Sequence, residues 1–130
     1  MPMLRRLFIL AFWAALVFAF VMASLPKPPP VPGDPGDKVQ HIIAFVTLTL
    51  LARFAYPRAN PIALLLAFTG FGAAIEFVQM IPALGRDAAL DDWGADVAAS
   101  AITLLILEPL RRLFARRSRS APQHVIDEPA

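Results

Sequence analysis

Four apolar stretches divide the chain of 130 residues, and polar side chains interrupt them mainly near their ends. The stretches cover about residues 7–25, 38–56, 61–81 and 92–110. An α-helix needs about 20 predominantly apolar residues to cross a bilayer, and each stretch is close to that length. The pattern therefore predicts an all-α polytopic membrane protein whose four transmembrane helices form a small bundle.

Turn-forming residues separate the four stretches. The segment 26–37 is rich in proline, which fixes φ and removes backbone donors, so it predicts an extended external linker. Asn60 suits a helix cap, Pro61 suits a first helical turn, and Pro82 follows the third stretch. The predicted organisation is a first membrane helix within residues 1–25, the linker 26–37, a three-helix core over 38–110, and a basic, disordered tail over 111–130.

A secretory signal peptide is the alternative interpretation of the first stretch. Val21, Met22 and Ala23 could precede a cleavage site. The apolar part is longer than the roughly 7–15 residues of a signal-peptide core. Its length favours an uncleaved membrane helix of the signal-anchor type.

The composition agrees with a membrane protein. Hydrophobic residues make up 58% of the chain and charged residues 17%, whereas soluble domains contain about 25% charged residues. Cysteine is absent, which excludes disulfides and thiolate chemistry. Lysine and arginine gather near the N-terminus, in the loop 53–60 and in the tail, so the positive-inside rule predicts that both termini are cytoplasmic. The sequence contains no nucleotide-binding loop or nucleic-acid motif, and no nucleic-acid partner is predicted.

Ionisable and amide side chains intrude on three stretches near the ends predicted to face outward. Such groups are costly in an apolar environment unless they are paired, hydrated or functional. Residues three or four apart share a helix face, and three pairs have this spacing: Asp37 with His41, Glu76 with Gln79, and Asp92 with Asp96. We therefore expect one polar cluster in the outer third of the bilayer, formed by Asp37, Lys38, His41, Glu76, Gln79, Arg86, Asp91, Asp92 and Asp96.

Several functions are open to such a cluster. Lys38 and Arg86 could hold a phosphate while the acids orient hydroxyl groups, which favours a pocket for a lipid headgroup or a cell-wall precursor. A membrane enzyme would use His41, Glu76, Asp92 and Asp96 for acid–base or hard-metal chemistry. No recognised metal motif is present, so the sequence predicts no metal, no cofactor and no assigned catalytic residue. A proton-coupled carrier and a purely structural polar knot between helices are the remaining alternatives.

Three short motifs resemble the VanZ-like family of small integral membrane proteins. Residues 37–41, Asp-Lys-Val-Gln-His, resemble the family's D-K-x-x-H element. Residues 75–79, Ile-Glu-Phe-Val-Gln, resemble its I-E-x-x-Q element, and residues 86–92 resemble its R-x-x-x-x-D-D element. The order and spacing of the motifs cover about residues 37–107. Asp96 stands where the family usually has Asn, and Ala99 stands where it has Gly.

The resemblance implies a multi-pass protein of the bacterial cytoplasmic membrane with a role in the cell envelope. The founding member of the family is associated with resistance to teicoplanin, a glycopeptide antibiotic. The expected partners are the bilayer itself and a lipid headgroup or cell-wall precursor. The oligomeric state is left open by the sequence.

Overall fold

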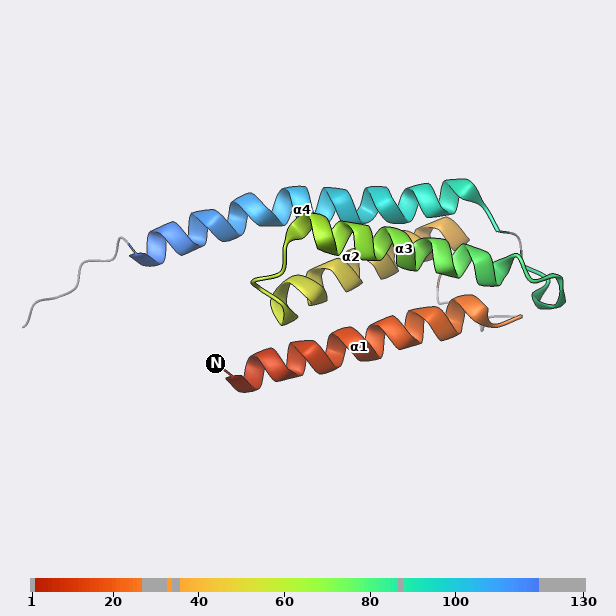
Figure 1. The fold of residues 1–130 in the computed structure, drawn as a ribbon, viewed down its shortest axis with the longest axis horizontal. Helices are drawn as coiled ribbons and strands as arrows, with labels where there is room; N and C mark the ends of the chain where they lie inside the picture. The colour runs from red at the N-terminus through yellow and green to blue at the C-terminus, as the bar shows by residue number, and fades with distance from the viewer. Residues whose placement is uncertain (1, 27–32, 34–35, 87, 120–130) are drawn as a thin grey trace, which may run out of the picture.

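The computed structural model describes residues 2–26, 33, 36–86 and 88–119. These residues form four α-helices and one short 3₁₀ helix: α1 (Pro2–Ser24), α2 (Asp37–Ala55), α3 (Pro61–Gln79), η1 (Pro82–Leu84) and α4 (Leu90–Arg119). The predicted all-α class is confirmed for this part of the chain (Figure 1).

The four α-helices lie alongside one another in a small bundle. Helix α2 packs between α1 and α4, and α3 packs mainly against α4. The start of α1, the α2–α3 loop and the second half of α4 share one end, which we call the basic end (Figure 1). The ends of α1 and α3, the start of α4, and η1 share the opposite end, which we call the acidic end.

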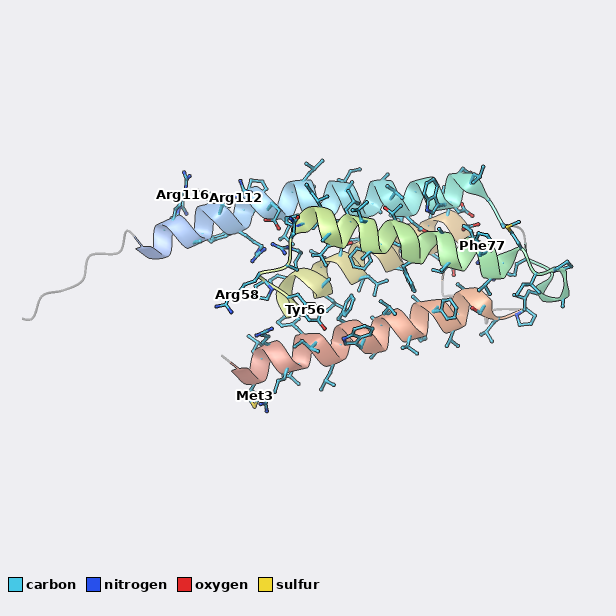
Figure 2. All side chains as sticks on the ribbon, in the orientation of Figure 1. Met3, Tyr56, Arg58, Phe77, Arg112 and Arg116 are labelled. Atoms are coloured by element: carbon cyan, nitrogen blue, oxygen red, sulfur yellow. The ribbon has the colours of Figure 1, made fainter. Side chains whose placement is uncertain are left out.

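Three of the helical segments are long and apolar enough to cross a membrane: Met3–Ser24, Asp37–Ala55 and Pro61–Gln79. Large apolar side chains cover the outside of the bundle, among them Phe77 on α3 (Figure 2). Leu66 on α3 and Leu105 on α4 are exposed as well. Buried positions in turn include polar residues such as Thr49 and Ser100. Apolar residues outside with polar residues inside suit a lipid environment better than water.

Aromatic side chains fill the middle of the bundle. Phe12, Phe45 and Phe68 are buried, and Phe68 lies 6.4 Å from Phe12 and 6.3 Å from Phe45 between ring centroids. This apolar cluster joins α1, α2 and α3.

The fourth helix differs from the sequence prediction. The fourth stretch is predicted to end near Leu110 and to be followed by a disordered tail, yet α4 includes Pro109 and continues to Arg119. The prediction of disorder is wrong for residues 111–119. Arginine is a good helix former, and Arg111 anchors this turn by donating to Glu108 Oε1 and to the Pro57 carbonyl. Residues 120–130 and the linker positions 27–32 and 34–35 lie outside the described residues.

The predicted cap of α3 is confirmed and provides a simple stability test. Asn60 Oδ1 accepts a hydrogen bond of 2.8 Å from the Ile62 N–H, and Pro61 is the first helical residue. Asn60→Ala is expected to lower the free energy of unfolding by about 1 kcal/mol, because one helix N–H loses its acceptor. Thermal unfolding in detergent micelles measures the change. Asn60→Asp retains the acceptor and serves as the control, so equal losses in both variants would contradict the assignment.

Candidate functional site

A buried histidine–carboxylate pair lies at the acidic end. His41 Nδ1 of α2 is 3.1 Å from Asp96 Oδ1 and 3.2 Å from Asp96 Oδ2 of α4. Both residues are buried, and Asp96 is 0% exposed. An ionised Asp96 only accepts hydrogen bonds, so with Asp96 ionised Nδ1 carries the proton and Nε2 is not used in this contact. The pair joins the two helices that the sequence predicts to meet.

The close approach of α3 to this pair depends on Gly72. A Cβ atom on Gly72 would lie 3.0 Å from Asp96 Oδ2 and 3.3 Å from Trp93 Cδ1. Trp93 is itself fixed, because its Nε1 donates 3.0 Å to the Thr69 carbonyl of α3. A close approach of this kind occurs at Gly72, whereas nothing lies within 4 Å of a Cβ on Gly70.

The two polar residues of α3, Glu76 and Gln79, contact different parts of the chain. Glu76 Oε2 accepts 2.8 Å from the Ala89 N–H and so fixes the segment before α4. Glu76 Oε1 is buried and has no hydrogen-bond partner among the described residues. Gln79 Nε2 donates 3.2 Å to the Ala23 carbonyl, which ties α3 to the end of α1. Gln79 thus faces α1 with its amide, while Glu76 stays within electrostatic range of His41 and Asp96.

Two ion pairs form the rim of the acidic end. Arg86 NH2 lies 3.2 and 3.4 Å from the two carboxylate oxygens of Asp37. Lys38 pairs with Asp91, and both of these side chains are exposed. The hydrogen bond and the charge of Lys38 hold the pKa of Asp91 below its usual value. Arg86 therefore joins the cluster through Asp37, while Lys38 and Asp91 form a solvent-facing pair beside it.

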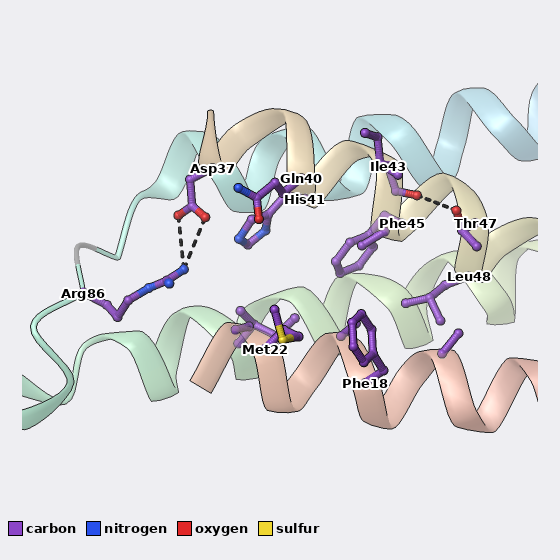
Figure 3. Close-up of a pocket in the computed structure, with 15 residues that line it drawn as sticks. Phe18, Met22, Asp37, Gln40, His41, Ile43, Phe45, Thr47, Leu48 and Arg86 are labelled. Carbon is purple, nitrogen blue, oxygen red and sulfur yellow. Dashed lines mark hydrogen bonds and ion pairs between the residues drawn. The ribbon is translucent and has the colours of Figure 1, made fainter. Parts of the chain in front are cut away.

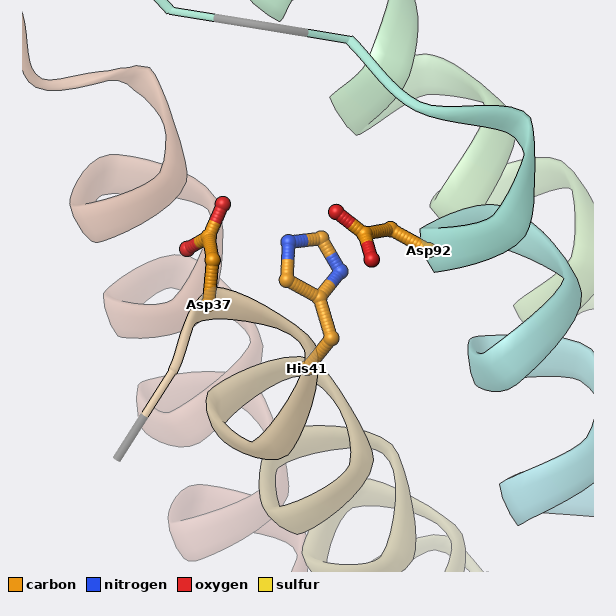
Figure 4. A group of neighbouring side chains, drawn as sticks. All are labelled: Asp37, His41 and Asp92. Atoms are coloured by element: carbon orange, nitrogen blue, oxygen red, sulfur yellow. The ribbon is translucent and has the colours of Figure 1, made fainter.

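The remaining predicted residue, Asp92, faces His41. One potential ligand atom from each of Asp37, His41 and Asp92 lies within 4.8 Å of the other two. Figure 4 shows the imidazole between the two carboxylates, with Asp37 on its own helix and Asp92 on α4. The structure thus brings most of the predicted cluster together: Asp37, His41, Glu76, Arg86, Asp92 and Asp96.

A cavity of about 390 Å³ runs between α1 and α2 from this cluster toward the middle of the bundle. Its walls are mainly apolar, with Phe18 and Met22 on one side and Phe45 and Leu48 on the other (Figure 3). Asp37, Gln40, His41 and Arg86 line its polar end. The cavity is therefore an apolar groove with a polar mouth, and Glu76, Asp92 and Asp96 are not among its lining residues.

A second ion pair, at the basic end, joins a buried arginine to a half-buried glutamate and is absent from the sequence prediction. Arg53 is 3% exposed, and its guanidinium lies 2.5 Å from Glu108 Oε1 and donates to the Ala59 carbonyl. Arg53 is interpreted from the sequence only as a topology signal. The signal that could have revealed the pair is Glu108, an acid inside the apolar fourth stretch at the level of an arginine in the last turn of α2.

Comparisons of the chain with protein-family models, with curated proteins and with solved structures return no match. The VanZ-like resemblance therefore stays a prediction that rests on the three motifs. The structure adds that residues of these motifs, from α2, α3 and the start of α4, lie at one end of the bundle.

Proposed function

We propose that this chain is a VanZ-like protein of the bacterial cytoplasmic membrane that binds a phosphate-bearing amphiphile. The apolar chain of the ligand occupies the groove between α1 and α2, and its headgroup lies at the acidic end. The observation that carries the proposal is the shape of the cavity, which is apolar along its walls and ends at Arg86, His41 and Asp37. A volume of about 390 Å³ falls within the range of small-ligand sites, about 300–1,000 Å³.

The proposal includes α4 as a fourth membrane span. The outer face of α4 is apolar, with Ile102, Leu105 and Ile106 exposed. Two ionisable residues within its apolar part face other helices, because Asp96 contacts His41 and Glu108 contacts Arg53. An ionisable group is tolerated within a membrane when it faces the bundle interior and is paired. This arrangement supports a lipid-facing α4.

The proposed orientation places the basic end in the cytoplasm. Arg58, Arg112 and Arg116 lie at this end (Figure 2), and Arg5 donates to the Ala55 carbonyl there. The positive-inside rule favours the side with more lysine and arginine as cytoplasmic. The acidic end and the mouth of the groove then face outward, where lipid-linked cell-wall precursors are used. A role in glycopeptide resistance is the phenotype that the family resemblance implies.

Arg86 is the cation best placed to select a phosphate. Its guanidinium carries fixed charge and several donors, which match a phosphate group. It lies at the mouth of the groove and is held there by Asp37. Lys38 is less suited, because it pairs with Asp91 and does not line the cavity.

The test measures binding of three lipids to the purified protein by native mass spectrometry. Phosphatidic acid, a polyprenyl phosphate and neutral diacylglycerol distinguish an ordinary phospholipid from a lipid carrier of cell-wall precursors, and a phosphate from none. Arg86→Gln is expected to weaken binding of both phosphorylated lipids by about 10-fold or more, because it removes a charge-assisted hydrogen bond, and to leave diacylglycerol binding unchanged.

A matched pair of variants on α1 tests the groove itself. Ala19 lines the groove, whereas Ala14 is exposed and is not among the lining residues. Ala19→Phe is expected to lower the affinity for all three lipids, because the new ring fills the space of the ligand chain. Ala14→Phe should bind as the wild type does. Wild-type binding by Ala19→Phe and Arg86→Gln together would overturn the proposed function.

A further inference from the structure

The side chains of Asp37, His41 and Asp92 have the composition of a metal site. They offer one imidazole nitrogen and two carboxylate groups, with potential ligand atoms within 4.8 Å of one another. Nitrogen together with carboxylate oxygen is a donor set that divalent zinc and manganese accept. Asp37 and His41 are one helical turn apart on α2, and Asp92 comes from the facing helix α4 (Figure 4).

The carboxylate of Asp92 is a second, independent observation. The residue is 8% exposed, and its side chain makes no hydrogen bond or ion pair within the described part of the chain. Figure 4 shows it directed toward the His41 ring. A buried carboxylate without a partner is costly, and a cation between Asp92, His41 and Asp37 would remove that cost.

Asp96 prepares His41 for this role. Metal-binding histidines commonly donate one ring N–H to a carboxylate, which fixes the ring and leaves the other nitrogen for the metal. His41 Nδ1 is held by Asp96 in this manner, so Nε2 is the nitrogen available to a metal. Arg86 also holds Asp37 in place, because its NH2 lies 3.2 and 3.4 Å from the two carboxylate oxygens. Each of these two ligands is therefore oriented by a neighbour.

The charges of the cluster also favour a divalent cation. Asp37, Asp92 and Asp96 contribute three carboxylates, and Glu76 lies nearby with one buried oxygen unpartnered. Arg86 is the arginine in contact with them, while Lys38 is engaged by Asp91 outside the cluster. Buried acids are stable only when they are paired, protonated or bound to a metal. Protonation is the competing solution, and it would require no metal.

We propose that Asp37, His41 Nε2 and Asp92 bind one divalent transition-metal ion, with Zn²⁺ and Mn²⁺ as the ions to test. Metal–ligand distances of about 2.0–2.2 Å require the three ligand atoms to move closer together than the 4.8 Å that now bounds their separations. Asp37 lies at the exposed start of α2, where its side chain has room to move. Three protein ligands leave a coordination position for water or an incoming ligand. Asp37 and His41 also line the mouth of the groove, so the ion would lie beside the proposed headgroup position. The sequence identifies His41 and Asp92 as candidates for hard-metal chemistry, but it does not reveal the set with Asp37, because the ligands come from two helices.

The experiment titrates chelator-treated protein, purified without a histidine tag, with Zn²⁺ by calorimetry and with Mn²⁺ by pulsed electron paramagnetic resonance. The His124→Gln background removes the second histidine of the chain. Saturable binding of one ion per chain, with nitrogen coupling to Mn²⁺, is expected. Asp92→Asn should lower the affinity by at least about 10-fold, and Asp96→Asn, which alters the residue that orients His41, by about 10-fold.

Asp91→Asn is the matched control, because it removes a neighbouring acid that faces Lys38, and it should bind metal as the parent does. His41→Gln should abolish the nitrogen coupling, which keeps the test decisive if Asp92→Asn does not fold. Absence of saturable binding, absence of nitrogen coupling, or equal affinities in Asp92→Asn and Asp91→Asn would overturn the proposal. Lipid binding is also measured in the presence of chelator. Lipid binding that persists without metal would show that the proposed function stands even when the metal site is overturned.

Discussion

Glu108→Gln is expected to lower the free energy of unfolding by about 3 kcal/mol or more, because it leaves a buried guanidinium without its counter-charge. Arg53 is 3% exposed, and Glu108 is the carboxylate that neutralises it. The remaining hydrogen bond from Arg53 to the Ala59 carbonyl does not supply a negative charge. The variant also removes the negative charge that pairs with Arg111, which lies in the extension of α4.

Thermal unfolding in detergent micelles, monitored by helical circular dichroism, measures this loss. Lys38→Gln is the matched control, because it breaks an ion pair between exposed side chains, which contributes little to stability. The double variant Arg53→Met with Glu108→Leu should recover much of the stability, since apolar residues of similar volume often replace a buried ion pair without loss. A Glu108→Gln variant as stable as Lys38→Gln would show that Arg53 does not depend on Glu108.

The ion pair at the basic end also bears on the alternative that polar groups here only hold helices together. Arg53 joins α2 to α4 and, through Ala59, to the loop before α3. Joining helices through polar groups is also the structural alternative that the sequence analysis gives for the acidic end. The two ends differ in one respect: Asp92 makes no hydrogen bond or ion pair within the described residues, whereas the carboxylate of Glu108 contacts both Arg53 and Arg111. The acidic end therefore retains capacity for a ligand.

The helices are largely predictable from the sequence, because their signals are local. Stretches of about 20 apolar residues define α1, α2 and α3, and Asn60 with Pro61 marks the start of α3. The end of α4 is mispredicted for the same reason. Pro109 and the arginines after it resemble a helix end, while the contact of Arg111 with the Pro57 carbonyl, which stabilises the extension, joins residues 54 positions apart.

The sequence predicts which residues belong to the candidate site, but it does not predict which of them contact one another. Spacing of three or four residues identifies which side chains share a helix face, and His41 and Asp96 do meet. The packing order, with α2 between α1 and α4, decides the individual partners. As a result, Arg86 pairs with Asp37 and Gln79 donates to the end of α1. The groove lies between α1 and α2. Helix spacing carries no information about these choices.

Gly72→Ala is expected to lower the free energy of unfolding by about 1–3 kcal/mol, the usual range for overpacking a close contact. The same change at Gly70 should be neutral or raise stability by up to about 1 kcal/mol, because alanine is the better helix former. Both glycines lie on α3, two positions apart. The helix propensity gained is the same in both variants, so the difference between them reports the space at Gly72 alone.

The neighbours of Gly72 cannot move aside easily, which is why the contact should be costly. A Cβ there would lie 3.0 Å from Asp96 Oδ2, 3.3 Å from Trp93 Cδ1 and 3.4 Å from Phe45 Cζ. The Asp96 carboxylate is held by His41, and Trp93 is held by its hydrogen bond to α3. A methyl group must therefore push α3 away from α4 or displace Asp96 from His41. Unfolding midpoints of both variants measure the first effect, and the nitrogen resonances of the His41 imidazole measure the second. Equal behaviour of Gly70→Ala and Gly72→Ala would show that α3 does not approach Asp96 as closely as the structure places it.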